Sequence, residues 1–179
     1  MKNNLIMKLL TLLIFLTATL AGCAAWGDRL SEEGRVLQAD DKPCFTVADN
    51  EETRVKLLEL STIDVSEVVS VGTNIRWEIS SKNHGNIISP TECITYGATP
   101  AQMKTEIQPI TLEVGKPYEM GIGSYVLKTP PNKWNRREYR ANFCLTQDES
   151  TKKITVHQVY YDDNLGKLRW DKCGIHISQ

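Results

Sequence analysis

The chain has 179 residues, of which 21 are basic and 22 acidic, so its net charge is −1 at pH 7. This near-neutral balance, with no basic block, argues against nucleic acid as a partner. The length fits a single domain that is long enough to bury a core without help.

Residues 1–22 are typical of a signal peptide. Lys2 and Lys8 supply a positive charge, and residues 9–20 are apolar except for threonines. This apolar run is short for a membrane-spanning helix, which needs about 20 apolar residues. We therefore expect residues 1–22 to direct export rather than to join the fold.

The sequence Leu20-Ala21-Gly22-Cys23 resembles the lipobox of bacterial lipoproteins, with an ordinary cleavable signal as the alternative. The resemblance implies cleavage before Cys23, a diacylglycerol on its thiol and an acylated amine. Several acyl chains, at about 0.8 kcal/mol per buried methylene, anchor a protein stably. Ala24, where sorting to the inner membrane favours aspartate, implies the outer membrane. We expect a lipid-anchored protein of the cell envelope that faces the periplasm.

Removal of residues 1–22 leaves 157 residues with 19 basic and 22 acidic side chains, a net charge of about −3. Residues 23–34 have little apolar content and contain several glycines and charges. They are predicted to form the lipidated cysteine and a flexible tether. Residues 35–179 then form one domain.

Four cysteines remain besides the one in the lipobox: Cys44, Cys93, Cys144 and Cys173. An even number in an exported chain predicts two disulfides, with buried free thiols as the alternative. Their wide spacing, without a Cys-x-x-Cys pair, argues against zinc, and we expect no metal site. Three pairings are possible, and the spacing does not choose among them.

Alternation of apolar and polar residues predicts several short strands. The clearest examples are residues 75–79, 110–114, 139–145 and 175–177. Residues 55–60 fit neither a helical nor a strand period, and residues 99–106 favour one helical turn, with Pro100 in its first turn. Gly121 and Gly123 predict a β-bulge or a close approach of another backbone. Short strands between regular turns favour an all-β fold, predicted here as a single antiparallel β-sandwich, with a barrel as the alternative.

The run LEVGKPYEMGIGSYVL, followed by REYRANFCL, resembles two neighbouring strands of an immunoglobulin-like sandwich. In sandwich domains an early strand and a late strand are often bridged. By that analogy the expected disulfides are Cys44 with Cys144 and Cys93 with Cys173.

Signs of catalysis are sparse. His84, His157 and His176 form no metal-ligand pair, and the sequence has no nucleophile elbow or phosphate loop. Acidic neighbours such as Asp162 and Asp163 lie in turn-like contexts, where they rarely converge as a general acid and base. We therefore expect a binding protein rather than an enzyme, with no cofactor and no small-molecule ligand. An envelope hydrolase, which would need convergent carboxylates, is the least favoured hypothesis.

Several short motifs follow the lipobox in order along most of the mature chain. They are Gly27-Asp28-Arg29, Cys44-Phe45-Thr46-Val47, Ile75-Arg76-Trp77-Glu78, Cys93-Ile94-Thr95-Tyr96-Gly97 and Phe143-Cys144-Leu145. Together they resemble the type VI secretion immunity periplasmic lipoproteins. The resemblance implies a protein that neutralises a toxin delivered by a neighbouring cell, by blocking it. The alternative is a structural or assembly lipoprotein of the cell envelope or of a secretion machine, and a neighbouring toxin gene would favour immunity.

The family gives no contact residues to transfer, so candidates for toxin binding come from this sequence alone. They are loop aromatics and charges: Trp134, Arg136, Arg137, Tyr160, Tyr161, Asp162 and Asp163. Aromatic and charged anchors dominate specific interfaces, which bury about 1,600 Å². The last four residues predict an aromatic and acidic finger. The alternative is that the tyrosines pack in the core and the charges are only solvated.

Overall fold

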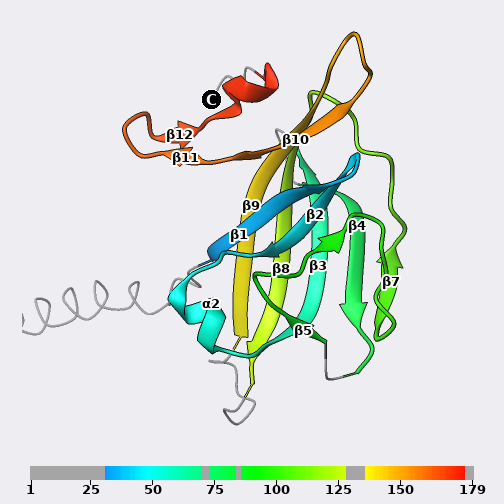
Figure 1. Cartoon of the computed structure of the whole chain (residues 1–179), viewed down its shortest axis with the longest axis vertical. Coiled ribbons are helices and arrows are strands. Elements are labelled where there is room, and N and C mark those ends of the chain that lie inside the picture. The colour runs from blue at the N-terminus through cyan, green and yellow to red at the C-terminus, as the bar shows by residue number, and fades with distance from the viewer. Residues whose placement is uncertain (1–30, 70–72, 84–85, 128–135, 176–179) are drawn as a thin grey trace, which may run out of the picture. The chain divides into compact units, whose positions relative to one another are not determined.

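A computed structural model describes residues 31–69, 73–83, 86–127 and 136–175 (Figure 1). The signal peptide, Cys23, Trp134, His84 and His176 lie outside these described residues. The elements before the C-terminal hairpin are β1 (Glu32–Ala39), β2 (Lys42–Val47), α2 (Glu51–Val55), β3 (Leu58–Val68), β4 (Thr73–Ser81), β5 (Ile87–Ile88), β6 (Ile94–Thr95), β7 (Met103–Ile107), β8 (Pro117–Val126), β9 (Arg136–Gln147) and β10 (Ile154–Val159).

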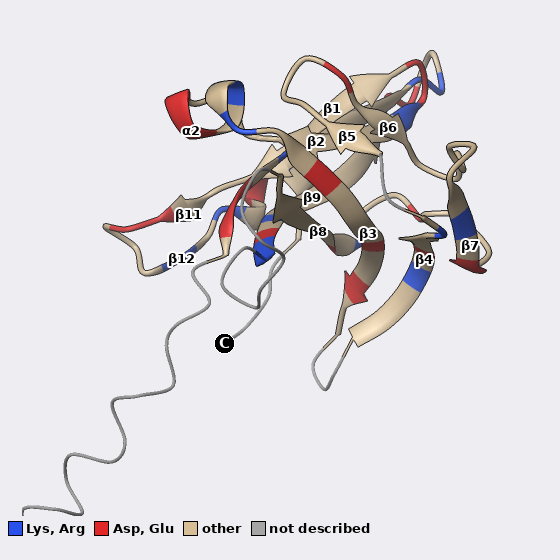
Figure 2. Cartoon of the chain, turned by 90° about the horizontal axis from the view of Figure 1, so that it is seen from below, with Lys and Arg blue, Asp and Glu red and all other residues tan. Residues whose placement is uncertain are grey.

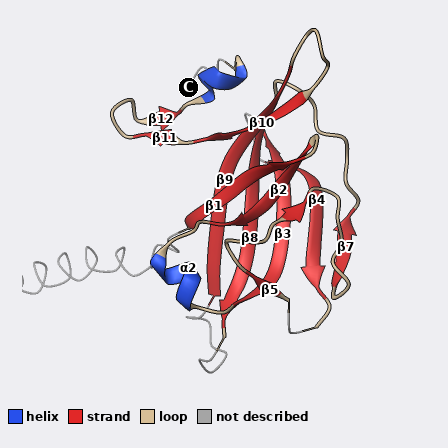
Figure 3. Ribbon diagram, viewed as in Figure 1, coloured by secondary structure: helices blue, strands red, loops and turns tan. Residues whose placement is uncertain are grey.

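These strands form one ten-stranded sheet in the order β6-β2-β1-β9-β8-β3-β4-β7, with β10 on β9 and β5 on β3 (Figure 3). β1 pairs with β9 in parallel at Glu32 and Glu33, and the other described pairs are antiparallel. The prediction of an all-β fold is confirmed. The sheet is mixed and continuously hydrogen-bonded, so the predicted single antiparallel β-sandwich is not confirmed.

The sheet curls because β1 leaves β9 after a short contact, and β10 pairs with the rest of that strand. Two glutamine side chains then join β1 to β10 in place of a backbone ladder. Gln38 donates a hydrogen bond to the Ile154 carbonyl at 2.9 Å, and Gln158 accepts one from the Val36 N–H at 2.8 Å. As a result β1 and β2 cross the face of β9 and β8, as Figure 1 shows.

The main core lies under this crossing and is rich in aromatic rings. Phe45 of β2 lies 5.6 Å from Phe143 of β9 and 6.2 Å from Trp77 of β4, measured between ring centroids. All three side chains are fully buried. The strands predicted around residues 75–79 and 139–145 are confirmed as β4 and β9.

Two predicted elements are wrong. Residues 110–114 are not a strand: the Ile110 N–H bonds to the Arg76 carbonyl, while the Glu113 N–H donates to the Tyr118 hydroxyl at 2.7 Å. These two backbone N–H groups therefore donate to separate residues and not to a ladder along one neighbouring strand. Residues 99–106 form a turn, closed by a hydrogen bond from Met103 N–H to the Pro100 carbonyl, and then enter β7 instead of a helix.

The structure also assigns residues 55–60, for which the sequence favoured no period, and the two ends of the domain. Residues 55–60 span the end of α2 and the start of β3, so neither period fits them. β1 begins at Glu32, so residues 32–34 belong to the sheet and not to the predicted tether. Ile175 follows a 3₁₀ helix outside any strand, and the rest of the strand predicted at 175–177 lies outside the described residues.

Gly121 and Gly123 of β8 were predicted to mark a β-bulge or a close approach of another backbone, and a close approach is found, but from side chains. A Cβ added at Gly121 would lie 2.6 Å from Oδ1 of Asp64, and one at Gly123 would lie 2.5 Å from Oγ1 of Thr62. The close approach therefore comes from side chains of β3 rather than from a backbone. The register between β3 and β8 shifts between Leu60 and Thr62, so the bulge lies opposite Gly123.

Candidate partner-binding site

A hairpin after β10 carries four of the residues predicted to bind a partner. β11 (Tyr161–Asp162) pairs antiparallel with β12 (Lys167–Leu168) in a separate two-stranded sheet. Tyr160, Tyr161 and Leu165 are 55%, 59% and 56% exposed. In Figure 1 the hairpin extends away from the large sheet. It therefore presents three large apolar side chains to solvent.

The base of the hairpin rests on a second, smaller core. This core consists of Cys144, Val159, Trp170 and Cys173, and the last two belong to the 3₁₀ helix η3 (Trp170–Cys173). The Cys144–Cys173 disulfide joins β9 to η3, and the Arg169 N–H bonds to the Tyr160 carbonyl at 3.0 Å. The chain before and after the hairpin is thus fixed to the sheet.

The pairing predicted for the disulfides is wrong, although both bonds form. The pairs are Cys44–Cys93 and Cys144–Cys173, with Cα–Cα distances of 5.5 and 6.1 Å. Successive side chains of a strand point to opposite faces. Phe45 and Phe143 both enter the main core, so their neighbours Cys44 and Cys144 point away from it on opposite sides. Cys44 and Cys144 therefore cannot meet.

The hairpin's own charges hold its turn together. The Asp162 carboxylate accepts hydrogen bonds from the Asn164 and Leu165 N–H groups at 3.0 and 3.2 Å and from Arg169 at 3.1 Å. The bond from Arg169 is the main cause that keeps the pKa of Asp162 below its usual value. Asp162 is therefore part of the hairpin's structure, and Asp163, which is exposed, is the acid left for a partner.

Arg169 also bonds to Asp171, with both nitrogen–oxygen distances at 2.9 Å. This bond is the main cause that lowers the pKa of Asp171 to about 2. One guanidinium thus joins the end of β11 to η3, and the hairpin is held by charge as well as by a disulfide.

Arg136 and Arg137 lie elsewhere, at the start of β9. Nitrogens of Arg137 lie 3.0 Å from a Glu32 oxygen and 3.8 Å from a Glu52 oxygen, so this side chain links β9 to β1 and α2. The hairpin follows β10, which pairs with the other end of β9. The structure therefore does not place the predicted arginines and the hairpin in one cluster.

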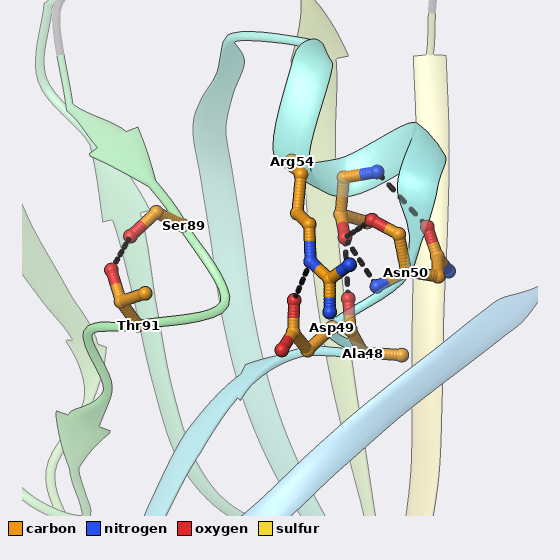
Figure 4. A network of polar contacts seen from close by, with 7 residues as sticks. Ala48, Asp49, Asn50, Arg54, Ser89 and Thr91 are labelled. Atoms are coloured by element: carbon orange, nitrogen blue, oxygen red, sulfur yellow. Dashed lines mark hydrogen bonds and ion pairs between the residues drawn. The ribbon is translucent and has the colours of Figure 1, made fainter.

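A network of polar contacts, shown in Figure 4, fixes α2, whose Glu52 lies near Arg137. Asn50 caps the helix by accepting from the Thr53 N–H at 3.0 Å, and the Thr53 hydroxyl donates to the Ala48 carbonyl at 2.6 Å. Arg54 bonds to Asp49 at 2.6 Å. Such a capping box satisfies backbone groups at the start of a helix, so this region is a structural connection.

Figure 2 shows acidic residues along β3, and Asp64 is one of the acidic residues of this strand. Burial raises the pKa of Asp64 to about 6, the positive charge of Arg140 lowers it, and the negative charges of Glu78, Glu119 and Glu138 raise it further. Arg140 is itself bonded to Glu119 and Glu138. Asp64 is therefore a carboxylate whose charge is costly at neutral pH.

Histidines and possible metal ligands were located within the described residues. Within them, no group of three or more His, Cys, Asp or Glu side chains is placed to hold a metal ion. His157 of β10 forms a hydrogen bond with the Thr146 hydroxyl at 2.8 Å across the β9–β10 pair. None of the helices in the described ranges has the length and apolar character needed to cross a membrane.

A groove on the large sheet contains no residue that the sequence predicted as a site residue. It has a volume of about 440 Å³ and is lined by residues of β3, β4, β8 and the segment after β4, including Thr62, Ser80 and Tyr125. Three strands separated in the chain build this groove, so no single stretch of sequence contains its whole lining. The local signal was Gly123, which leaves room for Thr62.

Comparison with known proteins gave no match to a protein-family model, a curated protein or a solved structure. The resemblance to immunity lipoproteins therefore rests on the sequence motifs. The geometry of the hairpin is a separate line of argument, because it does not depend on those motifs.

Proposed function

We propose that this is a lipid-anchored binding protein that faces the periplasm, and that it neutralises a type VI secretion toxin by blocking it. The observation that carries the proposal is the hairpin of Tyr160, Tyr161 and Leu165, exposed on an element that is fixed at its base. Grouped exposed apolar side chains mark interaction sites more often than single ones do.

The hairpin has the properties expected of an inhibitory interface. Tyrosine provides a large contact area and loses little conformational entropy on binding. The Cys144–Cys173 disulfide and the Asp162–Arg169 ion pair order the element before it meets a partner. This ordering reduces the entropic cost of association and increases affinity.

Charge complements this apolar surface. The exposed Asp163 and a net charge of about −3 on the predicted mature chain favour a basic surface on the toxin. Complementary charge mainly raises the association rate and excludes wrong partners. A toxin that acts by turnover must stay blocked, so we expect slow dissociation and an affinity in the nanomolar range or tighter, about −12 kcal/mol.

The test is survival of a strain that lacks the gene when its toxin-bearing parent attacks it. We expect the deletion strain to be killed and the wild-type gene to restore survival. Joint replacement Tyr160→Ser and Tyr161→Ser should abolish protection at matched protein levels, and Asp163→Lys should weaken it. Tyr125→Ser, which alters an exposed tyrosine of the large sheet, is the matched control and should protect fully.

Two results would contradict the proposal at different levels. A deletion strain as resistant as its parent would remove the immunity function and favour the envelope-assembly alternative. Full protection by the double tyrosine variant would leave immunity standing but remove the hairpin as its interface.

The proposed anchor has its own test, because it depends on Cys23 and not on the domain. Cys23→Ala should abolish incorporation of a palmitate analogue and block lipoprotein-type processing. Equal labelling of the variant and the wild-type protein would reject the anchor.

A further inference from the structure

The groove on the large sheet opens where β3 changes its neighbour. β3 pairs with β5 at Leu58 and Glu59 and with β4 from Thr62 onward, and Ser61 lies between these two pairings. The shift in register opposite β8 falls at the same point. β-bulges redirect side chains and are frequent next to binding sites. The bulge and the groove therefore coincide at residues 60–62.

The polar lining of the groove both donates and accepts hydrogen bonds. The side chains of Ser61, Thr62 and Ser80 supply hydroxyls, and Asn83 supplies an amide. Each hydroxyl can donate one hydrogen bond and accept others, and an amide does both. Ser80 already donates to Glu106, which leaves its oxygen as an acceptor for a ligand.

The two charges of the lining have opposite signs, Glu59 and Lys82. An anionic ligand would meet the carboxylate, and a cationic ligand would meet the ammonium group. The two charges offset each other, so the lining has no net charge and a neutral ligand meets no like charge. The charge pattern therefore favours an uncharged ligand.

An apolar surface adjoins this polar lining. Tyr125 of β8 and Ile87 of β5 are the direct partners of Glu59 on its two sides, so all three side chains share one face of the sheet. Tyr125 is 40% exposed and Ile87 is 45% exposed, whereas Glu59 is 6% exposed. A ring with one solvent-facing surface and a polar tip suits a ligand that is itself apolar on one face and polar at its edge.

We propose that this groove binds an uncharged oligosaccharide chain. One sugar ring lies with its C–H face on Tyr125, and the hydroxyls of the chain bond to Ser61, Thr62 and Asn83. The volume of about 440 Å³ is in the range of ligand sites, and the groove is open to solvent. Among its described lining residues Glu59 is the single carboxylate, whereas glycoside hydrolysis uses two, so the proposal is binding without cleavage.

The test is calorimetric titration of the whole chain in detergent with chitotetraose, with cellotetraose and with inorganic phosphate. We expect one or both sugars to bind and phosphate not to bind. Binding of chitotetraose alone would assign the site to N-acetylated glycans such as those of the cell wall. Binding of cellotetraose would assign it to plain hexose polymers.

Two variants locate the binding. Tyr125→Ala should weaken binding about tenfold, or about 1.4 kcal/mol. Ser61→Val, which removes a hydroxyl from the lining, should also weaken it. Tyr161→Ala on the hairpin is the control and should bind normally, and circular dichroism should show that all three variants are folded. Absence of sugar binding, sugar binding unchanged in both groove variants, or binding of phosphate in place of sugar would overturn the proposal.

Discussion

The large sheet and the C-terminal hairpin are stabilised in different ways. The sheet completely buries Phe45, Trp77 and Phe143, so its stability comes from burial. The hairpin has two strands of two residues each and leaves Tyr160 and Tyr161 in solvent. A two-stranded hairpin alone is marginal in water, and here a disulfide and an ion-pair network hold it. Apolar side chains can therefore stay exposed, and available to a partner, where a disulfide and ion pairs hold the element in place of burial.

The largest expected effect is in the sheet. Phe143→Ala removes a ring that contacts both Phe45 and Tyr118. It should lower the free energy of unfolding by about 3–5 kcal/mol. Tyr161→Ala, on the hairpin, should change it by no more than about 0.5 kcal/mol. Denaturant unfolding measures both, and equal losses would show that the two regions do not differ as described.

The next effect concerns the Cys144–Cys173 disulfide. Joint replacement of both cysteines by serine should cost about 2–4 kcal/mol. We expect amide exchange to accelerate in residues 160–173, while the amides of β3 and β8 stay protected. Peptide mapping of the unreduced wild-type protein should find Cys44–Cys93 and Cys144–Cys173. Uniform loss of protection, or another connectivity, would contradict the separation of the hairpin from the main core.

Asp64 gives the sheet a pH dependence. Its folded pKa of about 6 lies above the reference value of 3.8, so the folded state binds the proton more tightly. Stability is therefore fully present below about pH 4 and falls as pH rises to about 6. Asp64→Asn should raise the free energy of unfolding at pH 7 by about 1–2 kcal/mol and flatten the profile between pH 4 and 6. No gain at pH 7 would show that this carboxylate is well solvated.

The smallest expected effect is the pH dependence of the hairpin. Its stability falls as the pH is lowered, which is opposite to the effect of Asp64. The pKa values of Asp162 and Asp171 are lowered by Arg169, the latter to about 2. Their contribution is therefore present above the unfolded pKa near 4 and is lost as pH falls toward 2. Cross-strand contacts between Tyr161 and Leu168, followed by NMR, should weaken over that range while the core signals persist. Contacts that survive at pH 2 would show that the disulfide alone fixes the hairpin.

The sequence predicted those features that depend on neighbouring residues. Alternation identified the strands that contain Trp77 and Phe143, and the acidic pair Asp162-Asp163 indicated a turn. The same alternation failed at residues 110–114, because a period of two does not show whether a partner strand is present. The disulfide pairing, the parallel contact of β1 with β9 and the groove at Ser61 depend on how distant strands meet, which no local pattern contains.

We propose that the hairpin is the surface that blocks a toxin. The decisive measurement is amide hydrogen exchange of the chain, alone and in complex with a toxin identified in the survival experiment. We expect strong new protection in residues 160–168, with the amides around Tyr125 unchanged. Protection confined to other parts of the chain, with residues 160–168 exchanging as in the free protein, would contradict it.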